Sequence, residues 1–193
     1  MCPPGVGILA VNARAFAASE RNPAPRFYWD WVRRRFDLSY RKFCGTPPQN
    51  MMFGLEASLE LIFREGLDAV HARHTLLAGL VQAAVEGWRE GGALDFFARD
   101  AASRSVSVTT VAVNGVDVDA LRTLARERFQ VAIAGGLGPL TGRAFRIGHL
   151  GDSNPALILG AIGGVEAALL ALGVDVGGGG TRRAVQRLAA SAG

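Results

Sequence analysis

Residues 105–134 read SVSVTTVAVNGVDVDALRTLARERFQVAIA, and they indicate the architecture of the chain. The first nine residues are rich in β-branched side chains, which predicts a strand over 105–113. Val118, Leu121 and Leu124 recur at helical spacing, which predicts a helix over 117–128. The run VAIA predicts a second strand over 131–134. Alternating strands and helices of this length indicate an α/β domain.

The segments on either side extend this pattern. The glycine-rich loop GGLGPLTGR is followed by AFRIGHL, which predicts a third strand over 144–150. Residues 155–172 are almost all apolar and predict a helix that must be buried or lie on a partner. Residues 67–90 predict a long amphipathic helix that ends at Glu90-Gly91-Gly92. We therefore expect a small α/β sandwich with its helices on one face of a sheet.

The two ends of the chain carry other signals. GVGILAVN at 5–12 predicts a buried strand, whereas 13–43 shows no clear periodicity. Thr46 and Pro47 predict the cap and first residue of a helix that Gly66 ends. Residues 181–190 predict a short helix behind a flexible glycine linker. We expect residues 1–65 to end one domain, 66–176 to form a small domain, and 177–193 to be linker and terminal helix.

The composition indicates a soluble globular protein. The 193 residues are 49% hydrophobic and 20% charged, and no apolar run is long enough for a membrane span. The start lacks the charged and apolar regions of a signal peptide, and two cysteines are too few for a disulfide framework. We expect a cytoplasmic protein that does not bind membranes. Lys42 is the only lysine.

The formal charge of +4 comes from one segment. Residues 26–43 hold six basic and two acidic side chains among several aromatic ones. Arginines between aromatics suit a single-stranded nucleic acid, but they also suit a solvated turn beside an aromatic cluster or an acidic partner. Because no nucleic-acid-binding motif accompanies the segment, we expect no nucleic-acid partner.

Three groups of side chains could carry chemistry. Arg146 lies on a predicted strand, where its planar guanidinium could bind a substrate carboxylate or pair with a structural Asp or Glu. Thr46 at a helix start could bind a phosphate or simply cap its own helix. His71 and His74 are three residues apart on a helix, but a metal site needs further ligands. We assign no metal.

Four blocks together resemble the class V aminotransferases, specifically the serine–glyoxylate and alanine–glyoxylate branch. They are MCPPGVGILAVNARA, FYWDW, TPPQNMMFGLEASLELIFREGLDAVHARH and GGLGPLTGRAFRIGHLGDSNPALILGAIGGVEAAL. The resemblance implies a fold type I, pyridoxal-phosphate-dependent transferase, present as the small C-terminal α/β domain and the end of the large domain. It also implies a homodimer that acts on a small amino acid and a glyoxylate-like 2-oxo acid.

The resemblance implies roles for two residues and leaves two others without a counterpart. Arg146 matches the family arginine that binds the substrate's α-carboxylate, and Thr46 matches the threonine that binds the cofactor phosphate of the partner subunit. Phe43 stands where some members carry a phosphate-binding tyrosine. The family lysine that binds the cofactor covalently precedes the PPG block, so we expect it upstream of Met1 and assign no catalytic residue here.

The expected function is therefore that of the C-terminal portion of an aminotransferase, which moves an amino group from serine, or alanine, to glyoxylate. The alternative is a non-catalytic fragment that associates with a complete aminotransferase subunit. Without the lysine, this chain alone is expected to be inactive.

Overall fold

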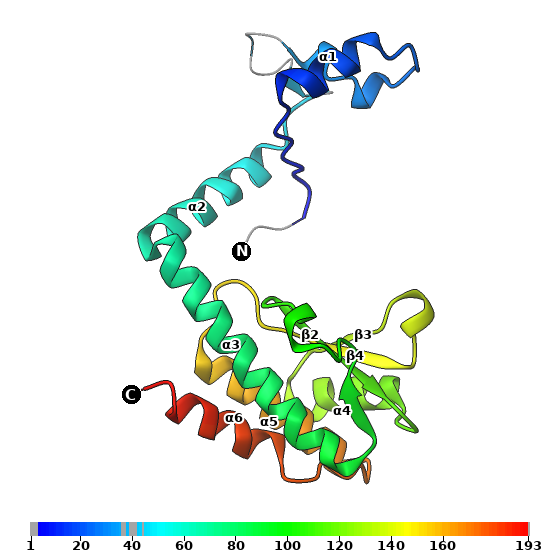
Figure 1. The fold of residues 1–193 in the computed structure, drawn as a ribbon, viewed down its shortest axis with the longest axis vertical. Helices are drawn as coiled ribbons and strands as arrows, with labels where there is room; N and C mark the ends of the chain where they lie inside the picture. The colour runs from blue at the N-terminus through cyan, green and yellow to red at the C-terminus, as the bar shows by residue number, and fades with distance from the viewer. Residues whose placement is uncertain (1–3, 36–37, 39–41, 44, 193) are drawn as a thin grey trace. The chain divides into compact units, whose positions relative to one another are not determined.

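A computed structural model describes residues 4–35, 38, 42, 43 and 45–192. The chain divides into two compact units, Met1–Arg64 and Glu65–Gly193. The first unit runs from blue to cyan in Figure 1, and the second runs from green to red. Within the described residues, no helix combines the length and the hydropathy that a membrane crossing requires.

The first unit begins with an exposed extended segment. Residues 5–12 pair with no strand, and Ile8 and Leu9 are 76% and 67% exposed. The prediction of a buried strand is therefore wrong, because a strand needs a neighbour for its backbone groups and the described part of this unit contains none. Helix α1 (Ala13–Arg21) follows, and its cap is Asn12, whose Oδ1 accepts a hydrogen bond from Ala15 N at 2.9 Å.

Helix α2 (Gln49–Glu65) starts later than the sequence predicts. Pro48, and not Thr46, occupies the capping position, since its carbonyl accepts hydrogen bonds from the backbone N–H groups of Met51 and Met52 at 2.9 and 3.0 Å. The predicted cap is wrong because Pro48 biases the residue before it, Pro47, away from the helical conformation, so the helix does not start at Pro47. The predicted end at Gly66 is confirmed, as its φ of +90° suits glycine.

The second unit contains an antiparallel sheet of four strands in the order β1-β2-β4-β3. These are β1 (Leu94–Phe96), β2 (Val108–Val113), β3 (Ala134–Gly135) and β4 (Ala144–Gly148). The strands predicted over 105–113 and 144–150 are confirmed with shorter bounds. The strand predicted at 131–134 is wrong over 131–133, because β3 contains only Ala134 and Gly135. Strand β1 was not predicted.

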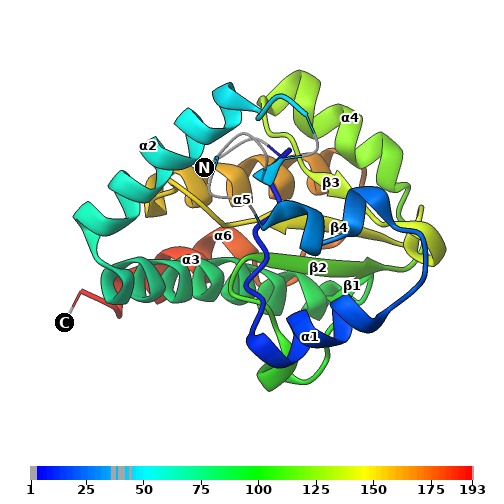
Figure 2. The ribbon, with the colours of Figure 1, turned by 90° about the horizontal axis from the view of Figure 1, so that it is seen from above.

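Four helices of this unit lie on one side of the sheet (Figures 1 and 2). They are α3 (Leu67–Trp88), α4 (Val118–Phe129), α5 (Pro155–Ala171) and α6 (Gly180–Ala189). Side chains of β2 and β4 alternate between this layer and the opposite face. Val111, Phe145 and Ile147 are at most 2% exposed and join the helices in one hydrophobic core. The predicted sandwich with helices on one face is confirmed, and α5 supplies buried residues to its core.

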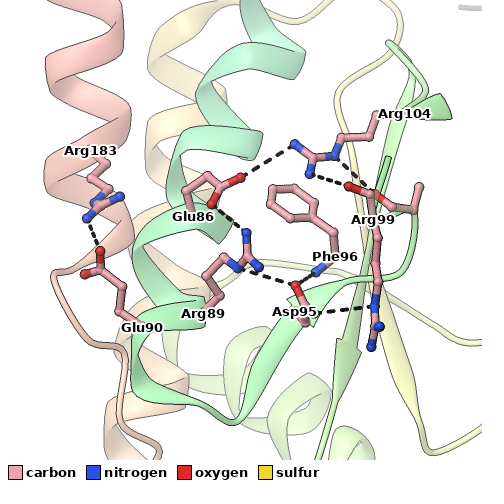
Figure 3. Close-up of polar contacts among 9 residues, drawn as sticks. Glu86, Arg89, Glu90, Asp95, Phe96, Arg99, Arg104 and Arg183 are labelled. Carbon is pink, nitrogen blue, oxygen red and sulfur yellow. Dashed lines mark hydrogen bonds and ion pairs between the residues drawn. The ribbon is translucent and has the colours of Figure 1, made fainter. Parts of the chain in front are cut away.

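The glycine run before α6 is a close-packed segment and not a flexible linker. A Cβ on Gly180 would lie 2.3 Å from Trp88 Nε1 and 2.7 Å from the carbonyl oxygen of Ala84, so only glycine fits between α6 and α3. Glu90 beside this run forms an ion pair with Arg183 of α6 (Figure 3). The prediction of a flexible linker is therefore wrong, because the glycines allow α6 and α3 to pack closely together.

Polar contacts hold the segment between β1 and β2 against the end of α3 (Figure 3). Glu86 pairs with Arg89 at 3.1 Å and with Arg104 at 3.7 Å, and Arg89 also pairs with Asp95 at 3.5 Å. The Arg104 guanidinium lies 3.5 Å from the centroid of the Phe96 ring. Each exposed pair contributes little by itself. Arg104, however, joins the inter-strand segment to both α3 and β1.

Candidate substrate-carboxylate site

Arg146 lies in the middle of β4, on the sheet face opposite the helices. Its neighbours Phe145 and Ile147 are buried in the core, whereas Arg146 itself is half-buried. Its Nε donates a hydrogen bond to the carbonyl oxygen of Gly135, on the adjacent strand β3, at 2.9 Å. This bond fixes one edge of the guanidinium plane.

The outer edge of this guanidinium makes no hydrogen bond or ion pair within the described part of the chain. No Asp or Glu there lies within ion-pair distance of Arg146, and no described group accepts a hydrogen bond from Nη1 or Nη2. A half-buried guanidinium keeps part of its hydration, and a carboxylate can replace that water with charge-assisted hydrogen bonds. The outer edge of the guanidinium can therefore bind an external carboxylate through bidentate hydrogen bonds.

His149 anchors the end of the strand that carries Arg146. The His149 ring is fully buried, with Nδ1 at 3.0 Å from the carbonyl oxygen of Val106 and Nε2 at 2.9 Å from Thr109 Oγ1. A carbonyl can only accept, so Nδ1 carries the proton and Nε2 accepts from the threonine hydroxyl. Burial lowers the pKa of His149, which keeps the ring neutral.

Two residues of α3 hold the loop between β4 and α5. Arg73 Nη1 donates to the carbonyl oxygens of Gly151 and Ser153 at 2.6 and 3.0 Å, while its Nε and Nη2 bind Glu65 at 2.7 and 2.8 Å. These hydrogen bonds from Arg73 also lower the pKa of Glu65. His74 Nε2 accepts from Gly151 N at 2.9 Å. The loop that follows Arg146 by a few residues is thus held by two neighbouring side chains of α3.

The histidine pair of the HARH sequence has no metal-binding geometry in the described residues. His74 is fully used, because Nδ1 donates to the carbonyl oxygen of Val70 at 2.7 Å while Nε2 holds the loop. No group of three or more His, Cys, Asp or Glu gathers anywhere in the described residues. The loop contacts of His74 and Arg73 join residues 77 to 80 apart in the chain, so the spacing of the two histidines did not indicate them.

Thr46 lies in the first unit and is exposed, between Gly45 and the two prolines that precede α2. Pro47 and Pro48 have no N–H groups, and Gln49 N already donates to the carbonyl oxygen of Pro47 at 2.9 Å. This helix start therefore offers few free backbone donors. An exposed threonine hydroxyl still fits one contact to a phosphate oxygen.

The described arginines of the basic segment contact their own surroundings. Arg34 Nη2 donates to the carbonyl oxygens of Phe27 and Tyr28 at 3.0 and 3.2 Å, and Arg33 lies over the Phe27 ring at 5.2 Å. Arg26 donates to the carbonyl oxygen of Ala24 at 3.1 Å. Residues 36, 37 and 39–41 of this segment lie outside the described residues. These contacts favour the local aromatic cluster among the alternatives that the sequence left open.

Comparison with known proteins identifies the class of protein. The family model described as Aminotransferase class-V matches residues 1–141, so the chain belongs to the class V aminotransferase family. A serine–glyoxylate aminotransferase of Methylorubrum extorquens is 36% identical over 182 residues, which cover 91% of this chain and 44% of that protein. The family resemblance seen in the sequence is confirmed.

The chain is also similar to a protein that bears another name and to an aminotransferase of known structure. A Synechococcus protein with the name "Soluble hydrogenase, small subunit" is 37% identical over 173 residues, covering 90% of this chain and 44% of its own length. The crystal structure of pyridoxamine-pyruvate aminotransferase from Mesorhizobium loti has a TM-score of 0.79 and 31% identity, covering 94% of this chain and 47% of that one. The fold type I class is therefore confirmed, and the chain spans about 44% of the length of these curated relatives.

Proposed function

We propose that this chain is the substrate-carboxylate-binding part of a pyridoxal-phosphate-dependent aminotransferase that moves an amino group from serine, or alanine, to glyoxylate. The observation that carries the proposal is Arg146, whose Nε is held by Gly135 while Nη1 and Nη2 contact no described group. Relatives named as serine–glyoxylate aminotransferases support the choice of donor and acceptor. With serine, the balanced reaction gives hydroxypyruvate and glycine.

Arg146 has an orienting role in this proposal. Its two outer nitrogens bind both oxygens of the substrate carboxylate, which fixes the direction of the bonds at the α-carbon. The Gly135 carbonyl prevents the guanidinium from turning away, and His149 together with Arg73 holds the end of β4 and the following loop. Each substrate, serine and then glyoxylate, carries such a carboxylate, so one arginine serves both halves of the reaction.

One residue of the first unit fits a contact to the cofactor in the assembled enzyme. Thr46 donates its hydroxyl to the phosphate of pyridoxal phosphate bound by the other subunit of a homodimer. When bound, the cofactor supplies an electron-withdrawing ring that makes the α-proton of the amino acid acidic. Turnover requires a lysine from outside these residues, since Lys42 lies in the block before Thr46 and outside the family's lysine motif.

The test is amino transfer by the protein as its gene encodes it. The protein is incubated with pyridoxal phosphate, serine and glyoxylate, and glycine and hydroxypyruvate are separated and quantified. Equal amounts of both products support the proposal, and faster reaction with alanine would change the donor. If no product forms, and the chain instead binds stably to a complete serine–glyoxylate aminotransferase subunit without adding activity, the proposal is wrong and the non-catalytic alternative holds.

A further inference from the structure

Two adjacent threonines on β2 have different surroundings. Thr109 is 6% exposed, faces the core, and its Oγ1 lies 2.9 Å from His149 Nε2. Thr110 is half-buried and, by the alternation of a strand, points to the opposite face of the sheet. The printed register places Thr110 directly opposite Arg146 on β4. The hydroxyl of Thr110 therefore shares a face with the guanidinium of Arg146.

The hydrogen-bond ladder brings these two side chains close together. His149 N donates to the carbonyl oxygen of the opposite residue Ser107 at 3.0 Å, which marks that pair as hydrogen-bonded. Hydrogen-bonded and non-hydrogen-bonded pairs alternate along an antiparallel ladder, and Thr110–Arg146 lies three rungs further along. It is thus a non-hydrogen-bonded pair, with Cα atoms about 4.5 Å apart and side chains in lateral contact.

The environment of the pair leaves both polar groups available to a ligand. Within the described residues, the Thr110 hydroxyl makes no hydrogen bond, and only the Nε of Arg146 does. The residue opposite Arg146 on its other side is Ala134, whose side chain adds no polar group and little bulk. A hydroxyl and the outer edge of a guanidinium thus lie side by side on one face of the sheet.

We propose that Thr110 is a second carboxylate-binding residue, whose hydroxyl donates a hydrogen bond to one oxygen of the carboxylate that Arg146 binds. This inference rests on the proposed function, in which Arg146 takes the α-carboxylate of the amino acid and of the 2-oxo acid. The guanidinium selects a carboxylate over a neutral amide of the same shape, because its N–H groups can only donate and an amide presents a single acceptor oxygen. The hydroxyl adds one further hydrogen bond to an oxygen of that carboxylate.

Substitutions of the two threonines separate binding from folding. Thr110→Val removes the hydroxyl at nearly constant volume, Thr110→Ser retains it, and Thr109→Val is the matched control on the core face. The probes are the Kd of glycolate, an unreactive carboxylate, by titration calorimetry, and the KM for serine in amino transfer to glyoxylate. Both are measured on the protein as its gene encodes it, with pyridoxal phosphate present.

We expect Thr110→Val to raise the glycolate Kd and the serine KM about tenfold, as for the loss of one hydrogen bond to a charged group. The Tm and kcat should stay near those of the wild type, and Thr110→Ser should recover most of the binding. Thr109→Val should lower the Tm, and it should raise the Kd less than Thr110→Val does, because Thr109 reaches Arg146 only through His149. If Thr110→Val does not fold, Thr110→Ala against Thr110→Ser makes the same comparison.

Each other result overturns a defined claim. If Thr110→Val binds glycolate like the wild type while Arg146→Gln does not, the role of Thr110 is wrong and the proposed function stands. If Thr110→Ser is as weak as Thr110→Val, the hydroxyl is not the binding group and the inference fails. If Arg146→Gln also leaves both constants unchanged, the proposed function fails with it.

Discussion

Replacing Glu166 by alanine should destabilise the second unit by removing a contact shared by three helices. Glu166 lies on α5, and its Oε2 accepts hydrogen bonds from Trp88 Nε1 of α3 and from Thr181 N of α6, each at 2.7 Å. Trp88 is 0% exposed, so no water can replace the lost acceptor without opening the core. The residue before α6, Gly179, has no side chain to cap the helix, so Glu166 performs that role.

The magnitude follows from these two bonds. A buried N–H left without an acceptor costs about 1–3 kcal/mol, and the loss of a helix cap costs about 1 kcal/mol. We therefore expect the free energy of unfolding to fall by about 3 kcal/mol. For a unit of 129 residues this corresponds to a Tm lower by roughly 10 °C.

Urea unfolding followed by circular dichroism measures this change, with Glu166→Gln as the control. Glutamine retains an oxygen that can accept both hydrogen bonds, so its loss should stay below about 1 kcal/mol. If Glu166→Ala loses no more stability than Glu166→Gln, then Glu166 does not join the three helices as described.

Two further predictions concern titration and packing. Because burial lowers the pKa of His149 from its ordinary 6.5, the unfolded chain binds that proton at a higher pH than the folded chain does. The contribution of His149 to the free energy of unfolding should be constant above pH 6.5. Below pH 6.5 it should decrease by at most about 1.4 kcal/mol per pH unit. Urea unfolding of His149→Gln at several pH values should show that this decrease is gone. Gly180→Ala should lower the free energy of unfolding by about 2 kcal/mol, because its Cβ would collide with Trp88. Gly163→Ala, with open space around it, should be neutral or stabilising. Equal melting curves for the two variants would contradict the packing at α6.

The regular elements of the second unit were predictable because each carries its own periodic signal. The helical spacing over 67–90 and 117–128 and the β-branched run at 105–113 correspond to α3, α4 and β2. Short elements lack such a signal, which explains why the three-residue strand β1 was missed and why β3 is shorter than expected. Their pairing depends on longer neighbouring strands, which local sequence does not reveal.

The candidate site was only partly predictable for a related reason. Arg146 stood out because a charged residue is unusual in an apolar strand, and its position on β4 is confirmed. The residues that support the site make contacts that no sequence spacing indicated. Gly135 contacts Arg146 from another strand, and Arg73 and His74 contact a loop that is distant in the chain. The helix predicted to start behind Thr46 begins at Gln49, because the second proline disfavours the helical conformation at Pro47.

The most direct test of the account is the KM for serine after Arg146→Gln, with Arg143→Gln as the control. Arg143 is an exposed arginine three positions before Arg146, and it lies just outside β4, which begins at Ala144. Arg146→Gln loses bidentate, charge-assisted hydrogen bonds, so its KM for serine should rise about 100-fold or more. The KM of Arg143→Gln should stay near that of the wild type. Equal KM values in both variants would show that Arg146 does not bind the substrate carboxylate.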